Sequence, residues 1–100
     1  MNLFNIESAT TTTLFAIHGN SGSINSIRLT NTHGSTSVEV QLYLEDSAAA
    51  KTYLAKTDIP GNTTLLLDGD VSFNNRIYAL KIETSAGGLS SSTPLSVIIK

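Results

Sequence analysis

The sequence of 100 residues contains no cysteine and no tryptophan, and only 14% of its residues are charged. Without cysteine the chain can form neither a disulfide nor a thiolate metal site, so its stability must come from packing or from association with other chains. The net charge is −2 and the six cationic residues are scattered along the chain. Because nucleic-acid binding needs a clustered basic patch or stripe, we expect no nucleic-acid partner.

Long apolar segments are also missing. No run approaches the roughly 18 apolar residues of a membrane-spanning helix, so we expect no membrane partner. The first residues lack the basic stretch and the long apolar core of a signal peptide, and we expect the mature protein to start near Met1. A chain of this length has room for one domain with one modest hydrophobic core.

Neutral polar residues are abundant instead, with 13 Ser, 13 Thr and 8 Asn among the 100 residues. Two interpretations are open. A surface of neutral hydrogen-bonding groups with few charges is easy to desolvate, which suits a protein that lies against neighbouring proteins. Equally, proteins built from strands and turns use many Thr, Ser and Asn for their backbone preferences alone.

The clearest pattern lies in residues 37–46, where apolar and polar residues alternate. The apolar positions are Val38, Val40, Leu42 and Leu44, and the positions between them are Glu39, Gln41, Tyr43 and Glu45. Successive side chains of a strand point to opposite faces, so this period of two predicts a half-buried antiparallel strand. The four apolar residues form one face that is predicted to be buried, which we call the dry face, and Tyr43 lies on the opposite, polar face.

Similar patterns recur along the chain. Further strands are predicted at residues 11–18, 23–32, 51–59, 63–67, 76–84 and 95–99, and turns or loops at 19–23, 31–35, 60–62, 68–70, 74–75 and 85–94. In the segment 51–59 the alternation places Tyr53 and Ala55 on one face. Turn signals every eight to twelve residues, without helical periodicity, predict an all-β fold. We expect a single antiparallel β-sandwich, jelly-roll or Greek-key like, of about seven to eight short strands, with a small barrel as the alternative.

The N-terminal segment, residues 1–12, shows no clear period, and we predict it to be an arm attached to a β-sandwich domain of residues 13–100. It carries the apolar residues Leu3, Phe4 and Ile6. An exposed apolar cluster often marks an interaction site, so these residues are predicted to dock on an adjacent subunit. The alternative is that they cover an open edge of their own sheet.

Chemistry-bearing residues form no recognisable reaction centre. His18 and His33 each precede a glycine in a predicted turn and have no acid or thiol at metal-ligand spacing. The acids in residues 68–70 lack the further oxygens of a calcium loop, and the serines at 90–92 lack a nucleophile elbow. We therefore predict no catalytic residue, no cofactor, no metal site and no enzymatic activity.

Four segments together resemble a known family. They are residues 9–15 (ATTTTLF), residues 26–32 (SIRLTNT), residues 38–44 (VEVQLYL) and residues 58–65 (DIPGNTTL). The likeness extends over most of the chain, and these segments carry it: the sequence resembles small virion structural proteins of tailed bacteriophages, of the capsid decoration or cement type. That resemblance implies a β-sandwich presented on the surface of a virion, without catalytic residues.

Among the roles on a particle, a decoration protein on the outer capsid surface fits best. Its partners would be the major capsid protein and copies of itself, with a homotrimer as a plausible assembly because closed cyclic symmetry is usual for identical subunits. The predicted partner-contacting residues are Leu3, Phe4, Ile6 and Tyr43. Two alternatives remain open: a tail, neck or fibre component, and a carbohydrate-binding β-sandwich in which Tyr43 contacts the sugar.

Overall fold

The structure is a computed structural model that describes residues 2–17, 23–74, 76–85 and 89–100. These residues form eight strands. The strands are β1 (Asn2–Ile6), β2 (Thr11–Phe15), β3 (Ser23–Asn31), β4 (Val38–Asp46), β5 (Lys51–Ile59), β6 (Thr63–Ser72), β7 (Tyr78–Thr84) and β8 (Leu95–Ile99). The predictions for His18, for most of the turn at 19–23 and for residues 75 and 86–88 fall outside the described residues. None of the described residues belongs to a helix long and apolar enough to cross a membrane.

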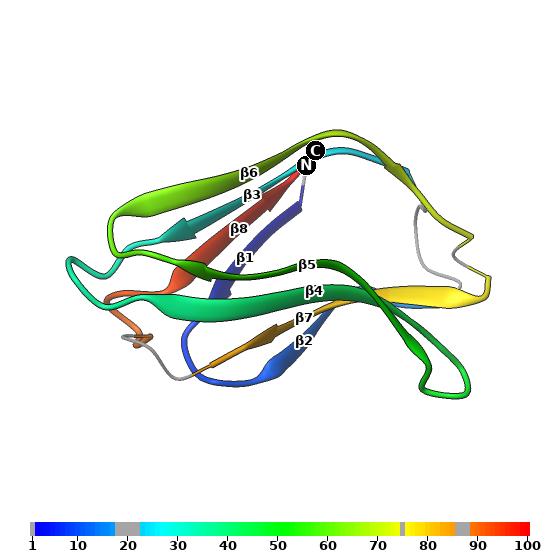
Figure 1. Ribbon diagram of the computed structural model, residues 1–100, viewed down its shortest axis with the longest axis horizontal. Helices are drawn as coiled ribbons and strands as arrows, with labels where there is room; N and C mark the ends of the chain where they lie inside the picture. The colour runs from blue at the N-terminus through cyan, green and yellow to red at the C-terminus, as the bar shows by residue number, and fades with distance from the viewer. Residues whose placement is uncertain (1, 18–22, 75, 86–88) are drawn as a thin grey trace.

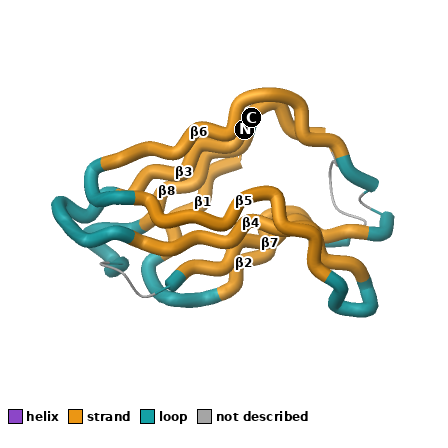
Figure 2. Tube along the Cα trace, viewed as in Figure 1, coloured by secondary structure: helices purple, strands orange, loops and turns teal. Residues whose placement is uncertain are grey.

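The strands form two antiparallel four-stranded sheets, in the orders β1-β8-β3-β6 and β2-β7-β4-β5. Figure 1 shows the sheets as two stacked layers, and Figure 2 shows the loops gathered at the ends of the strands. Every connection except β4 to β5 crosses from one sheet to the other. This order of strands is that of a jelly roll. The predicted all-β sandwich is therefore confirmed.

β4 lies inside its sheet, between β7 and β5, and its dry face is central to the core. Val38, Val40 and Leu42 are completely buried, as the alternation predicted. The inward side chains of the other strands meet them between the two sheets. The remaining buried apolar residues of this core are Ile6, Leu14, Phe15, Ile24, Ile27, Leu29, Ile59, Leu80, Ile82, Leu95, Val97 and Ile99.

The segment expected to be an arm forms the edge strand β1. It pairs with β8 of the same chain, from Asn2 opposite Ile99 to Ile6 opposite Leu95. The buried Thr84 fixes the connection to β2, because its Oγ1 donates a hydrogen bond to the carbonyl of Ser8 at 3.0 Å. Within one chain, the segment thus covers the edge of its own sheet. Docking of this segment on an adjacent subunit stays a prediction.

The turn predicted at residues 68–70 is wrong, because β6 runs through it without reversing. In the register with β3, Ser26 stands opposite Asp68 and Ile24 opposite Val71. One residue of β3 therefore faces two residues of β6, which is a β-bulge. A glycine between two acids can mark either a reversal or a bulge, and pairing with β3 selects the bulge.

Two connections at one end of the sandwich are held together by the buried side chain of Asn31. Its Nδ2 donates to the carbonyls of Thr36 at 2.8 Å and Ile59 at 2.9 Å, and its Oδ1 accepts a hydrogen bond from the His33 N–H at 3.1 Å. The turn predicted at 60–62 is confirmed, and within it Asn62 adopts a left-handed conformation with φ of 53°. The side chain of Asn31 thus joins the β3–β4 loop to the last residue of β5.

The β4–β5 turn contains a strained residue, Ala49, whose φ is 65°. The Asp46 carboxylate holds this turn by accepting hydrogen bonds from the N–H groups of Ala48 at 2.9 Å and Ala50 at 3.0 Å. A left-handed conformation costs an L-residue roughly 1–2 kcal/mol, which glycine avoids.

We expect the substitution Ala49→Gly to raise the free energy of unfolding by about 0.5 kcal/mol, because the relief of strain exceeds the added entropy of the unfolded chain. Urea denaturation monitored by tyrosine fluorescence would measure the change. Ala48→Gly is the matched control and should lower stability slightly. A stability that falls equally in both variants would contradict the assignment of strain to Ala49.

Candidate functional site

The outer face of the β1-β8-β3-β6 sheet carries a row of four side chains, one from each strand, of which three are apolar and one is an arginine; we call it the apolar row. The register places Leu3 opposite Ile98, Ile98 opposite Arg28, and Arg28 opposite Leu66. Leu3 is 67% exposed and Leu66 is 47% exposed. Since neighbouring strands lie about 4.8 Å apart, the row spans about 14 Å.

A second row beside it consists of neutral polar side chains: Asn5, Ser96, Thr30 and Thr64. These side chains hydrogen-bond to one another in pairs. Ser96 Oγ donates to Asn5 Oδ1 at 3.2 Å, and the hydroxyl oxygens of Thr30 and Thr64 lie 2.9 Å apart. Because these groups satisfy part of their hydrogen bonding within the sheet, removing water from them is less costly.

Arg28 is the one charged residue in these two rows. Its guanidinium makes no ion pair, hydrogen bond or ring contact with the residues that the structure describes. We call the apolar row and the polar row together the neutral face. Such a surface offers a largely uncharged area with one cation that has no partner among the described residues.

The outer face of the β2-β7-β4-β5 sheet differs, because aromatic and charged residues cluster on it. Tyr43 on β4 stands opposite Tyr53 on β5, and their ring centroids are 5.7 Å apart with the rings tilted by 60°. The register shift between Leu42 and Tyr43 makes Leu54 the extra residue of a β-bulge in β5. The prediction that Tyr53 and Ala55 share a face is wrong for this reason: Ala55 lies opposite the inward-facing Leu42, while Tyr53 faces outward.

Two lysines of β5 lie over these rings. The ammonium nitrogen of Lys51 is 4.8 Å from the centroid of the Tyr43 ring, and that of Lys56 is 5.7 Å from the centroid of the Tyr53 ring. At these distances an ammonium group is attracted to the negative face of the ring. We call Tyr43, Tyr53, Lys51 and Lys56 the tyrosine face.

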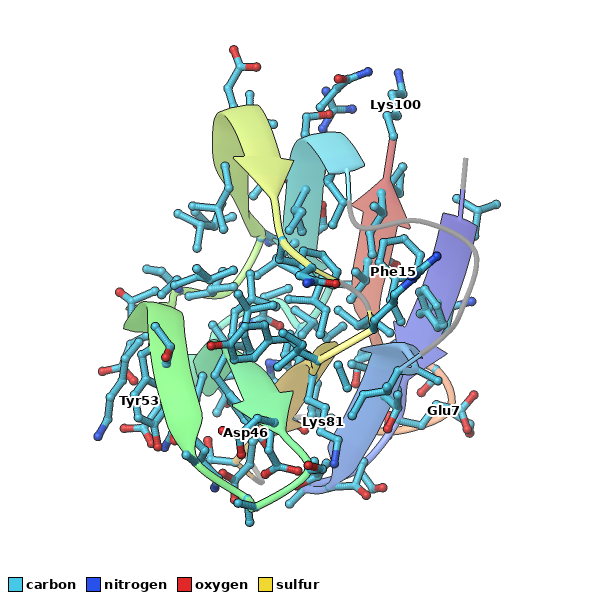
Figure 3. The ribbon with its side chains drawn as sticks, turned by 90° about the vertical axis from the view of Figure 1, so that its right-hand side faces the viewer. Glu7, Phe15, Asp46, Tyr53, Lys81 and Lys100 are labelled. Carbon is cyan, nitrogen blue, oxygen red and sulfur yellow. The ribbon has the colours of Figure 1, made fainter. Side chains whose placement is uncertain are left out.

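A third lysine, Lys81 on β7, forms an ion pair beside the tyrosine face. Its Nζ donates a hydrogen bond to Glu45 Oε1 at 2.6 Å. The hydrogen bond to the Glu45 carboxylate raises the pKa of Lys81 above its ordinary value, so this group stays charged at neutral pH. In Figure 3, Lys81 and Tyr53 lie on the side of their sheet that faces away from the β1-β8-β3-β6 sheet.

The four residues predicted to contact a partner lie in different environments. Leu3 is exposed on the neutral face, whereas Ile6 is 4% exposed and belongs to the core, and Phe4 packs against that core. Tyr43 lies on the outer face as predicted, but it is only 2% exposed because neighbouring side chains cover it. Its neighbour Tyr53 is 47% exposed and presents the accessible aromatic ring.

Sequence reasoning missed Leu66, Ile98, Tyr53, Lys51 and Lys56 as surface groups that could act together. The sequence contained only part of the information needed to find these groups. Leu66 is the middle of three consecutive leucines, a run in which one side chain must point away from the core. The assembly of each group depends on strand order and on one bulge, which no local pattern displays.

The described histidine and the serine and threonine hydroxyls near residue 90 take part in local hydrogen bonds. The residues that the structure describes contain no group of three or more His, Asp or Glu side chains that could hold a metal ion. His33 serves its own turn, because its Nδ1 accepts hydrogen bonds from the N–H groups of Ser35 at 3.1 Å and Thr36 at 3.0 Å. The hydroxyls of Ser90 and Thr93 lie 2.8 Å apart, in contact with each other.

No protein-family model and no curated protein sequence matches the chain. Several solved structures are similar to it. The crystal structure of PirA is 13% identical, with a TM-score of 0.55, covering 98% of this chain and 89% of PirA. The CBM32 domain of AlyQ, solved in complex with 4,5-unsaturated mannuronic acid, is 13% identical with a TM-score of 0.50, covering 96% of this chain and 72% of that one.

A structure of infectious bursal disease virus, Gt strain, is 16% identical with a TM-score of 0.44, and the match spans 28% of that viral chain. At these identities, the similarity to PirA and to the CBM32 domain shows a shared β-sandwich fold. The chain is thus a β-sandwich domain of a kind that occurs in unrelated proteins, and its function must be argued from its own surfaces.

Proposed function

We propose that this protein is a non-enzymatic structural protein of a bacteriophage virion, a decoration protein that binds the outer capsid surface and stabilises contacts between major capsid subunits. The neutral face carries this proposal. It extends across four strands, presents Leu3, Ile98 and Leu66 in one row, and holds a single cation, Arg28, that forms no ion pair with the described residues. The resemblance of the sequence to virion proteins supports the same role.

The physical argument starts from desolvation. A face with few charges loses little hydration energy when it is covered, and its exposed leucines gain from burial. Arginine is enriched in protein interfaces because its planar guanidinium donates several hydrogen bonds in a fixed arrangement. A protein that binds assembled capsid and not free subunits stabilises the shell by mass action. Leu3, on the edge strand β1, lies where an adjacent subunit could also be contacted.

Binding to capsids that lack the protein would test this proposal. The double substitution Leu3→Ser and Leu66→Ser should lower the amount of protein that sediments with capsids by about tenfold at a fixed concentration, since both apolar contacts are lost. Ile77→Ser is the matched control, because Ile77 is 49% exposed and lies outside the neutral face. It should leave binding unchanged.

Images of the same particles would locate the bound protein. Density on the outer capsid surface is expected. Unchanged binding by the double variant would contradict the neutral face as the contact surface, and density confined to the tail, neck or fibres would contradict the decoration role. Single serine substitutions at exposed positions keep the core intact, whereas deletion of residues 1–8 would also remove the buried Ile6.

The second candidate function is carbohydrate binding, and the tyrosine face favours it. Tyr53 offers a half-exposed ring that could pack against the apolar face of a sugar, with ammonium donors beside it. The similar CBM32 domain was solved with a mannuronic acid derivative. Jelly rolls occur both in viral capsids and in lectins, so the fold is compatible with either function.

A further inference from the structure

The ligand that best matches the tyrosine face is an acidic one. Lys51 and Lys56 form no ion pair within the described part of the chain. Glu45, which stands opposite Lys51 in the register, is engaged by Lys81 at 2.6 Å. Gln41, which stands opposite Lys56, carries no charge. Glu39 and Asp58 stand on the same face next to Gln41 and Lys56, but the ammonium of Lys56 lies over the Tyr53 ring and forms an ion pair with neither. Both lysines can therefore meet a ligand placed on the tyrosine rings.

Tyr53 indicates a second property of the ligand, an apolar surface, because the tyrosine lies between these two lysines along β5. The buried Tyr43 supports the ring from one side at 5.7 Å, so Tyr53 is held in place while 47% of it remains accessible. A small inorganic anion would leave this ring unused, and a neutral sugar would leave both ammonium groups unused. A ligand that combines an apolar ring face with carboxylates satisfies both.

The spacing of the lysines indicates more than one carboxylate. Lys51 and Lys56 are five residues apart on an extended strand, which corresponds to at most about 17 Å between their backbone positions. The two side chains converge on the tyrosine rings from opposite ends. A short oligosaccharide with repeated carboxylates could lie along β5 and reach both ammonium groups.

We infer that the tyrosine face binds a carboxylated polysaccharide, with Tyr53 packing against one sugar ring and Lys51 and Lys56 pairing with carboxylates. The inference rests on the second candidate function, carbohydrate binding, and narrows its ligand to uronic-acid polymers. It places the sugar site on the opposite sheet from the neutral face. One molecule could therefore lie on a particle and hold a polysaccharide at the same time.

Isothermal titration with oligogalacturonate, and with the same oligosaccharide fully methyl-esterified, would test the inference. The ester keeps the sugar rings and removes the charges. At low ionic strength, the wild-type protein should bind the acid form about tenfold more tightly than the ester, because each charge-assisted hydrogen bond adds affinity. Added salt should weaken binding of the acid form.

Substitutions separate the contribution of the lysine charges to binding from that of the Tyr53 ring. Lys51→Gln combined with Lys56→Gln should remove the preference for the acid form, while Tyr53→Ala should weaken binding of both forms. The matched control is Arg76→Gln combined with Lys100→Gln, which removes the same charge from exposed positions outside both the tyrosine face and the neutral face, and it should bind like the wild type.

Each outcome has a distinct meaning. Equal affinity for acid and ester would overturn the carboxylate inference and leave carbohydrate binding standing, whereas no binding of either form would overturn both. Equal weakening in the charge-matched control, or equal competition by inorganic polyphosphate, would show non-specific attraction of anions and would also overturn the inference. None of these results bears on capsid binding, which is measured on particles.

Discussion

Replacement of Asn31 by leucine should lower the free energy of unfolding by about 4 kcal/mol, which is a large part of the stability of a domain of this size. Asn31 is 1% exposed, so water cannot replace its hydrogen bonds. The substitution keeps the number and branching of the side-chain heavy atoms but leaves the carbonyls of Thr36 and Ile59 and the N–H of His33 without their partner. Each buried backbone group that loses its hydrogen bond costs about 1–3 kcal/mol.

Urea and thermal denaturation would measure this loss, and the melting temperature should fall by roughly 20 °C. Asn25→Leu is the matched control, because Asn25 belongs to the same strand, β3, and its side chain is exposed. It should change stability by no more than about 0.5 kcal/mol. If Asn31→Leu also changed the free energy of unfolding by no more than about 0.5 kcal/mol, the role assigned to Asn31 would be refuted.

Gly61→Ala should be the second most damaging change, with a loss of about 2–3 kcal/mol. A Cβ atom at this position would lie 2.7 Å from the Ser35 nitrogen and 2.8 Å from the His33 oxygen. Both contacts are with backbone atoms, so no side chain can move aside. The β3–β4 loop would have to shift, and the hydrogen bond from Asn62 N–H to the His33 carbonyl, now 2.9 Å, would be strained.

Gly34 provides a close comparison for this substitution, since it lies in the same pair of loops and a Cβ there would meet no atom within 4 Å. Gly34→Ala should be neutral or slightly stabilising, because alanine reduces the entropy of the unfolded chain. The difference in urea midpoint between the two variants is the decisive quantity. Similar midpoints would show that the loop tolerates a methyl group at residue 61 and that the close packing is not required.

Both substitutions act on a connection between the sheets and not on either proposed binding surface. Asn31 and Gly61 lie where the β3–β4 and β5–β6 connections meet, away from Tyr53 and from the Leu3–Leu66 row. Their variants should therefore lose capsid or sugar binding only to the extent that they unfold. Binding measured well below the melting temperature should be unchanged, which separates stability from recognition.

Much of the fold could be predicted from local pattern. Alternation in residues 37–46 identified the side chains of β4 that enter the core, and the same period in β3 places Ile27 and Leu29 in the core. β8 begins and ends at the predicted residues. These predictions are confirmed because the direction of a strand side chain depends on the two-residue period of the backbone, which is a local property.

Bulges explain most of the errors, and pairing determines bulges. The extra residue Leu54 turns Tyr53 outward, and the extra residue in β6 replaces the turn predicted at 68–70 with continuous strand. Where a bulge lies depends on which register best satisfies the neighbouring strand. A pattern read along one strand contains no information about that neighbour.

The tyrosine face and the neutral face each combine features that the local sequence pattern predicts with neighbours that only the tertiary structure brings together. The sequence already contained a dry face on β4, a tyrosine on the opposite face of that strand and an abundance of neutral polar groups, because composition and period require no partner. Only the folded chain brought Tyr43 to Tyr53, and Leu3 into one row with Ile98, Arg28 and Leu66. Those neighbours come from distant parts of the chain, and strand order and register, set by packing of the whole core, place them side by side.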